Sequence, residues 1–139
     1  MVDPVAVAVQ YLRADAALAS MVGERIAGKH HYGHYWPRGN PGIVLHLDGD
    51  VIDPYTGVHS ARMEMRVYAS DTVTAMSILR TLETILLAID RAELNDTTYG
   101  NHALIYSALP DSGVSLLKDD ALGMEIAQVF YEWRMQEVT

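Results

Sequence analysis

The sequence predicts an α+β fold in which a mostly antiparallel sheet of four to five strands carries two helices packed on one face. Within the stretch that begins at His59, residues 61–67 alternate between apolar and polar side chains, which is the pattern of a strand with one buried face. After Ser70 and Asp71, apolar residues recur every three or four positions up to Ile89, which is typical of an amphipathic helix. Hairpin-length turns divide the C-terminal half, and such turns favour antiparallel pairing.

The other elements are predicted from their boundaries. Asp3-Pro4 combines an N-cap with a proline suited to the first helical position, and this helix should end near Gly23, a natural C-terminal cap. The sequence then predicts, in order, a loop at 27–42, a short strand at 43–47, a second polar loop at 48–57, the strand and helix described above, a polar connection at 94–100, and strands at 102–109, 114–117 and 124–136. The last strand has two mixed faces, so we expect cover on both sides over part of its length.

Composition limits the classes of function. A chain of 139 residues, half of them apolar and a fifth charged, is expected to form one domain over 1–139. The absence of cysteine excludes disulfides, thiolate catalysis and cysteine zinc sites. The net charge of -8 argues against a sequence-specific reader of nucleic acid, although an acidic wall would let DNA slide past without sticking. We also expect no secretion signal and no membrane association, because the N-terminus lacks a basic region and the longest apolar runs are far shorter than the roughly 20 residues of a membrane span.

The most serious candidate for chemistry is a histidine cluster in the first loop. His30, His31 and His34 could hold zinc or nickel, with Asp48 or Asp50 from the second loop as a further ligand or base. Glycines and prolines around the cluster argue against the helix that would align His30 with His34. The alternative, which we favour, is a surface loop whose aromatic residues meet a partner chain.

Other motifs are incomplete. Residues 23–30 resemble a phosphate-binding loop but have His30 where Ser or Thr would hold magnesium. The acids at 48, 50 and 53 resemble the start of a calcium loop, but the distal glutamate is missing. Ser115 and Lys118 match S-x-x-K formally, without the helix that this motif begins. We therefore predict no catalytic residue, no metal and no cofactor, and a protein that is not an enzyme.

The two loops instead predict protein contacts. Both are long for so small a domain, and long loops in compact domains are usually functional. They carry residue types that anchor protein interfaces. The predicted interface residues are Tyr32, Tyr35, Trp36, Arg38 and Tyr55.

Several phrases along the chain resemble a known family. They are ALASMVGERI at the end of the first helix, PGIVLHL, ARMEMRVYA followed by the helix DTVTAMSILRTLETIL, and the last strand GMEIAQVFYEWRM. Together they cover nearly the full length, and they resemble the tail terminator or tail-completion proteins of long-tailed bacteriophages. The resemblance implies a structural protein that forms a hexameric ring at the head-proximal end of the tail tube, stops tube growth and joins the tail to the capsid connector.

The same resemblance implies the partners and the location. The partners would be further copies of this chain, the tail tube protein and the head–tail connector proteins, with DNA passing through the ring. The protein would belong to the tail or neck of the virion, assembled in the host cytoplasm. Three alternatives remain open: another neck component such as a head-closure or tube protein, a small metal-dependent enzyme using the histidine loop, and a stand-alone module that binds a small ligand.

Overall fold

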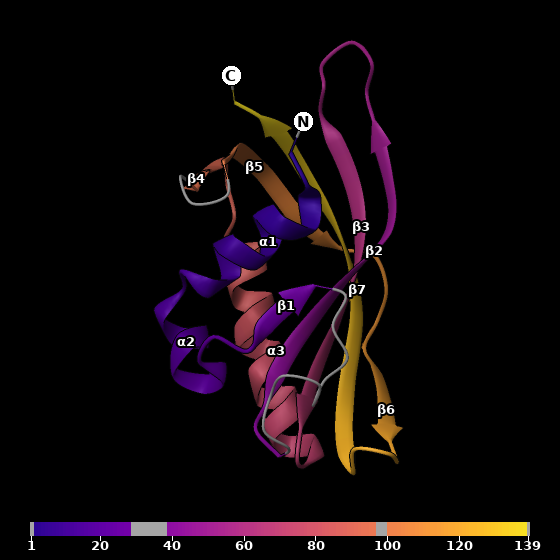
Figure 1. The fold of residues 1–139 in the computed structure, drawn as a ribbon. Coiled ribbons are helices and arrows are strands. Elements are labelled where there is room, and N and C mark those ends of the chain that lie inside the picture. Colours follow the sequence, from indigo (N-terminus) through magenta and orange to yellow (C-terminus); the bar gives the residue numbers. More distant parts are fainter. Residues whose placement is uncertain (1, 29–38, 97–99, 139) are drawn as a thin grey trace.

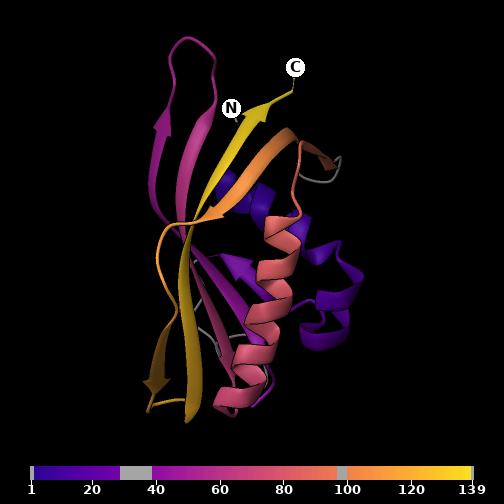
Figure 2. The same cartoon turned by 180° about the vertical axis from the view of Figure 1, so that it is seen from behind.

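The computed structural model describes residues 2–28, 39–96 and 100–138 (Figure 1). The described elements are, in chain order, α1 (Pro4–Arg13), α2 (Ala16–Val22), β1 (Ile26–Gly28), β2 (Gly42–Ile52), β3 (His59–Ala69), α3 (Thr72–Leu87), β4 (Ala92–Asp96), β5 (Asn101–Pro110), β6 (Ser115–Asp119) and β7 (Met124–Glu137). All the described helices lie on one face of a single curled sheet (Figures 1 and 2). The α+β class and the placement of the helices on one face are therefore confirmed.

The sheet is almost entirely antiparallel, as predicted. Its order is β1-β2-β3-β7-β5-β4, and β6 pairs with the N-terminal half of β7. Only the pairing of β1 with β2 is parallel among the described strands. The long strand β7 therefore has β3 along one side, and β5 and then β6 along the other.

The core lies between the helices and the inner face of the sheet. In β3 the buried residues alternate with half-buried polar ones, as the sequence predicted. Met63, Met65 and Met135 are fully buried and fill the core. Tyr131 and Trp133, which share a face of β7, are also fully buried. Both rings therefore belong to the core.

The outer face of the sheet also carries a small apolar cluster. Val44, Tyr68, Met124 and Ile126 are buried there, and Leu122 packs against them. This cluster covers the N-terminal end of β7 on the side away from the helices. Cover on both faces over part of β7, expected from its mixed pattern, is confirmed.

The predicted number of helices is too small, because the N-terminal helix is two helices. Asp15 interrupts it: its carboxylate accepts a hydrogen bond from the Leu18 N–H at 3.1 Å and so becomes the N-cap of α2. The axes of α1 and α2 differ by 88°. The predicted end at Gly23 is confirmed, since Gly23 caps α2 with a positive φ of 60°.

The predicted number of strands is also too small. The described chain has seven strands, and β1 and β4 were not expected. β1 is three residues long and exists only because β2 lies beside it. β4 occupies part of the predicted polar connection at 94–100, where polar residues alternate with the half-buried Ala92 and Leu94. Neither strand has the length or composition that identifies a strand locally.

The predicted loop at 48–57 is wrong in its first half, because β2 continues to Ile52. The pairing of β2 with β3 shifts register between Leu47 and Asp50 and then resumes. Asp48-Gly49 therefore forms a bulge in the strand where the sequence suggested a turn, and Gly49 adopts the positive φ of 147° that the bulge requires.

No single helix among the described residues has both the length and the apolar composition needed to cross a membrane. The bent pair α1 and α2 meets the length and composition test only when the two helices are taken together.

Candidate interaction surfaces

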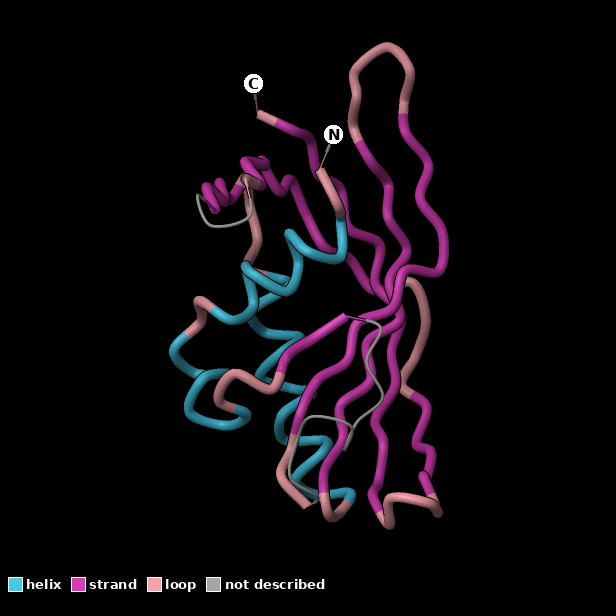
Figure 3. The backbone as a smooth tube through the Cα atoms, in the orientation of Figure 1, coloured by secondary structure: helices cyan, strands magenta, loops and turns pink. Residues whose placement is uncertain are grey.

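The most prominent surface feature is the end of the β2–β3 hairpin, residues 48–60, which we call the arm. It extends beyond the rest of the sheet (Figures 1 and 3). Residues 48–52 of β2 and 59–60 of β3 are strand, and residues 53–58 form the turn between them. Its turn is built by Asp53, whose backbone carbonyl accepts from the Gly57 N–H at 2.8 Å and whose carboxylate accepts from the Tyr55 N–H at 2.8 Å. Gly57 has a φ of 73°, which favours glycine. The arm is therefore an ordered hairpin with a defined turn.

One side-chain contact within the arm, together with side chains from β5 and β7, holds the arm in place. His59 is 3% exposed, and its Nδ1 lies 2.9 Å from a carboxylate oxygen of Asp50 across the hairpin. Gln136 in β7 donates from Nε2 to the Thr56 carbonyl at 2.7 Å, and its Oε1 accepts from the Tyr106 hydroxyl at 2.7 Å. These bonds connect the arm to β5 and β7, so its direction is set by the sheet.

The arm exposes apolar side chains that no described residue covers. Val51 is 72% exposed, Ile52 is 39% exposed, and Tyr55 at the tip is 96% exposed. An ordered hairpin that presents an aromatic residue and two β-branched residues to solvent has the composition of a protein contact.

The outer face of α3 is the second candidate surface. Two adjoining hollows of about 510 and 330 Å³ lie along the first half of the helix and share Val73 and Ser77. Their remaining lining residues are Thr72, Thr74, Met76, Ile78, Arg80 and Thr81 of α3, with Met21 of α2 and Pro41. Val73 is 80% exposed, and Leu87 at the end of the helix is 57% exposed. Surface helices usually carry charge on the face that meets solvent, whereas interface cores are poor in charge.

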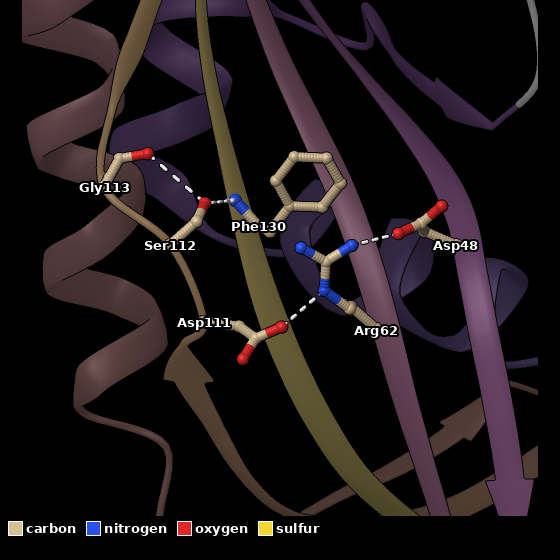
Figure 4. A network of polar contacts seen from close by, with 6 residues as sticks. All are labelled: Asp48, Arg62, Asp111, Ser112, Gly113 and Phe130. Atoms are coloured by element: carbon tan, nitrogen blue, oxygen red, sulfur yellow. Dashed lines mark hydrogen bonds and ion pairs between the residues drawn. The ribbon is translucent and has the colours of Figure 1, made fainter.

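A polar network on the outer face of the sheet supports the base of the arm (Figure 4). Arg62 in β3 donates to Asp48 of the β2 bulge and to Asp111, which follows β5. Its guanidinium carbon lies 4.0 Å from the centroid of the Phe130 ring, a cation–π contact. The hydrogen bond to Asp111 and then that to Asp48 raise the pKa of Arg62. The guanidinium thus joins β2, β3 and β7 and the segment after β5 at the point where the arm leaves the sheet.

The turn after β5 completes this network. The Ser112 hydroxyl accepts from the Phe130 N–H at 3.2 Å and donates to the Gly113 carbonyl at 3.2 Å (Figure 4). The Asp111 N–H donates to the Phe130 carbonyl at 2.8 Å. These bonds hold Asp111 beside Arg62 without any regular strand pairing.

The third candidate surface is β6. Val114, Leu116 and Leu117 are 41%, 57% and 40% exposed, and β7 is the only described strand that pairs with β6. A free strand edge with exposed leucines on both faces can accept another chain.

The structure places one of the five predicted interface residues. Tyr55 is exposed at the tip of the arm, as an interface residue would be before its partner binds. Tyr32, Tyr35, Trp36 and Arg38 lie outside the described residues, and so do His30, His31 and His34. Their assignments remain predictions.

Within the described residues, no group of three or more His, Asp or Glu side chains could hold a metal ion. The three acids that resembled a calcium loop have separate roles: Asp48 contacts Arg62, Asp50 contacts His59, and Asp53 builds the turn of the arm. The bulge turns successive side chains to different sides of the hairpin, so the three carboxylates do not converge.

Several surface residues were missed by the sequence-based prediction. Val51 and Ile52 are the apolar pair inside the polar stretch 48–57, and this contrast was an available signal. The scarcity of charge on the outer face of α3 was a second signal, since Arg80 and Glu83 are the only charged residues of that helix. The exposure of Leu116 and Leu117 had no local signal, because two adjacent leucines are also common in short buried strands.

Comparison with known proteins shows the fold. No protein-family profile and no curated protein sequence matches the chain significantly. Among solved structures, the chain is similar to a chain of the structure described as "Virion of native gene transfer agent (GTA) particle", with a TM-score of 0.62 and 16% sequence identity. The match covers 94% of this chain and 92% of the other. The two chains therefore share one fold over nearly their whole lengths.

Proposed function

We propose that this chain is a structural protein of a phage-like virion and acts as a tail terminator. In this role it forms a homo-hexameric ring at the head-proximal end of the tail tube, stops tube growth and joins the tail to the capsid connector. The observation that carries the proposal is the near full-length likeness to a chain of a gene transfer agent virion. Neither chain has a large region that the other lacks, so the whole domain, rather than an added part, would serve the shared role.

The surfaces support an assembly role. The arm, the outer face of α3 and β6 each expose apolar side chains on a protein whose core is otherwise well covered. A ring of identical subunits needs two different contact surfaces on each subunit, and these three features lie on separate parts of the molecule (Figures 1 and 2). The tail tube protein and the connector proteins would bind the two ends of such a ring.

The electrostatics are consistent with a DNA channel. A net charge of -8 leaves six or more copies strongly acidic, and like charge repels phosphate. DNA would pass through the lumen without being bound in a sequence-specific way. The proposed location is the tail or neck of the virion, after assembly in the host cytoplasm.

The first experiment measures the mass of the untagged protein by native mass spectrometry over a range of concentrations, with and without zinc. A six-fold mass without metal is the expected result. The protein is then added to growing tail tubes, and tube lengths are measured by electron microscopy. Tubes of limited length, with a ring at one end, would confirm terminator activity.

Other outcomes separate the alternatives. Filaments of stacked rings from the purified protein alone would favour a tube protein. A monomer with one tightly held metal would support the enzyme that uses the histidine loop. A bare monomer that also leaves tube growth unchanged would contradict the proposed function.

A further inference from the structure

We propose that the arm of one copy docks on the outer face of α3 of a second copy. Tyr55 would enter the hollow beside Val73, and Asp53 would face Arg80. This inference deepens the proposed function and rests on it, because it identifies the contact that joins neighbouring subunits of the ring.

The arm cannot reach this hollow in its own chain. The arm meets the body of the sheet at His59, where β3 begins, and α3 begins just after β3 ends at Ala69. At 3.3 Å per residue, the length of β3 separates these two points by roughly 33 Å. The arm also projects away from the N-terminal half of α3 (Figures 1 and 2). A contact between them must therefore be between molecules.

The lining of the hollow has the low charge and the exposed apolar residues expected of a surface that a partner covers. Of the six residues that line its larger part, only Arg80 is charged, and Val73 is 80% exposed. The smaller part adds Met21 and Pro41, which are both half-buried. Thr72, Val73 and Ser77 of the lining are exposed, so a second molecule can reach the hollow.

The charges of the two surfaces are complementary. Asp48 and Asp50 are already engaged by Arg62 and His59, which leaves Asp53 as the carboxylate that the arm can offer to a partner. One oxygen of Asp53 accepts the N–H groups of the turn, and the other has no partner among the described residues.

Arg80 is the matching group. Its side chain forms no hydrogen bond or ion pair within the described part of the chain, although it lines the larger hollow. An arginine without a partner in an otherwise uncharged hollow favours the binding of an acidic side chain from another molecule. The arm tip offers one carboxylate beside one exposed aromatic ring, which matches one arginine beside one apolar hollow.

The contact is head-to-tail by construction. The arm and the hollow are different surfaces that lie far apart on the folded subunit. Each copy can therefore give its arm to one neighbour and receive the arm of another. Repetition of this contact produces a closed ring if the rotation between copies closes, and an open filament if it does not.

A disulfide test exploits the absence of native cysteine. Tyr55→Cys and Ser77→Cys are prepared as separate proteins, mixed and oxidised, and the products are separated under non-reducing conditions. Ser77 is exposed and lines both hollows. A cross-linked heterodimer that forms much faster than either homodimer is the expected result, and a chain carrying both substitutions should give a ladder of oligomers.

The competing docking surface supplies the matched control. Leu116→Cys replaces Ser77→Cys in the same mixture, since Leu116 in β6 is similarly accessible. Faster cross-linking of Tyr55→Cys to Leu116→Cys would overturn the inference and assign the arm to β6. No cross-link to Ser77→Cys at the highest soluble concentration would also overturn it.

Charge variants test the proposed ion pair without disturbing the fold. Asp53→Asn retains the oxygen that accepts the turn N–H groups, and Arg80→Gln retains the length and polarity of the exposed side chain. Each should weaken self-association about tenfold, and the double variant should be no weaker than either single variant, because the two charges act as a pair. Additive losses would show that the two residues do not meet.

The outcomes separate this inference from the proposed function. A six-fold assembly without the Tyr55–Ser77 cross-link would retain the terminator ring and reject the docking. A cross-linked ladder that grows into open filaments would retain the docking and reject the terminator ring.

Discussion

Tyr131 shows how one buried hydroxyl connects the helical layer to the sheet. Its ring is fully buried in the core, and its hydroxyl donates to a carboxylate oxygen of Glu83 in α3 at 2.7 Å. Burial and then this hydrogen bond raise the pKa of the Tyr131 phenol above its ordinary value. The neutral phenol is therefore the form that the fold stabilises.

The consequence is a dependence of stability on alkaline pH. Because the folded pKa is raised, the stabilisation is complete below the ordinary tyrosine pKa of about 10 and is lost as pH rises through the higher folded value. Tyr131→Phe should cost about 1 kcal/mol at neutral pH and should reduce the loss of stability above about pH 10. Urea unfolding across this pH range measures both effects.

The control is Tyr55→Phe, which removes a hydroxyl from a ring that is 96% exposed. It should leave the free energy of unfolding at neutral pH within about 0.5 kcal/mol of the original. Equal losses for the two variants would mean that the Tyr131–Glu83 bond contributes nothing.

Gly28 lies at a position that has no room for a side chain. A Cβ at this position would collide with Cγ1 of Val5, where α1 crosses β1. Gly28→Ala should therefore push the helix from the sheet and lower the free energy of unfolding by roughly 1–3 kcal/mol. Gly113→Ala is the control, since no heavy atom lies within 4 Å of a Cβ there and its φ is not positive. Thermal unfolding of the two variants would reveal the difference, and a neutral Gly28→Ala would show that α1 is loosely packed.

At the scale of elements, the break between α1 and α2 depends on one cap. Asp15 follows Arg13 and Ala14 in a stretch without proline or glycine, so the apolar spacing alone suggests one continuous helix. The carboxylate instead satisfies the Leu18 N–H and starts a new helix at an angle of 88°. The turn places Leu18 and Val22 in the core.

Removal of this cap should destabilise the protein. Asp15→Ala should cost about 1 kcal/mol, while Asp15→Asn, which retains an accepting oxygen, should cost only a few tenths. Chemical denaturation of the two variants gives the comparison. Equal costs would mean that packing against the sheet, rather than the cap, sets the angle between the helices.

Elements with a strong local period were predictable, and those defined by their partners were not. The β3–α3 unit was predicted because the apolar period changes from two to about four within a few residues. β1 and β4 were missed because pairing with β2 and β5 creates them. The arm was taken for a loop because Asp48-Gly49 reads as a turn in isolation, whereas the neighbouring strand converts it into a bulge.

At the scale of the whole molecule, folding and assembly should be separable. Tyr55→Ala should change the free energy of unfolding by less than about 0.5 kcal/mol, because the ring makes no contact with the core of its own chain. The same variant should lose self-association, since aromatic anchors dominate binding energy. Native mass spectrometry and urea unfolding on one preparation test both statements.

Leu109→Ser provides the comparison for this prediction. Leu109 is 56% exposed on β5, where it pairs with Glu132 of β7, and it belongs neither to the arm nor to the lining of the hollow. Its replacement should alter neither stability nor assembly. If Leu109→Ser disrupts assembly as strongly as Tyr55→Ala, the relevant interface is the sheet surface and not the arm.

Some of the candidate surface residues were identified from the sequence, and others were not. Tyr55 was identified from sequence because an aromatic residue in a polar stretch is unusual wherever that stretch lies. The hollow on α3 was not identified, although most of its lining lies within residues 72–81 and the scarcity of charge on that helix was a local signal. The network around Arg62 was not identified, because its members are scattered along the chain. Arg62 meets Asp48 and Asp111, which are 14 and 49 residues away in sequence.

The sequence by itself determined the α+β class, the buried face of β3, the stripe of α3 and the start and end of the N-terminal helical segment. These features follow from the spacing of apolar residues and from caps that act within a few positions. Only the tertiary structure decided that the helical segment bends at Asp15, that β1 and β4 complete the sheet, and that residues 48–60 project as an arm. β1, β4 and the arm depend on pairing with partners elsewhere in the chain. The cap of Asp15 is local, but the bend becomes favourable only when the sheet is in place to bury Leu18 and Val22.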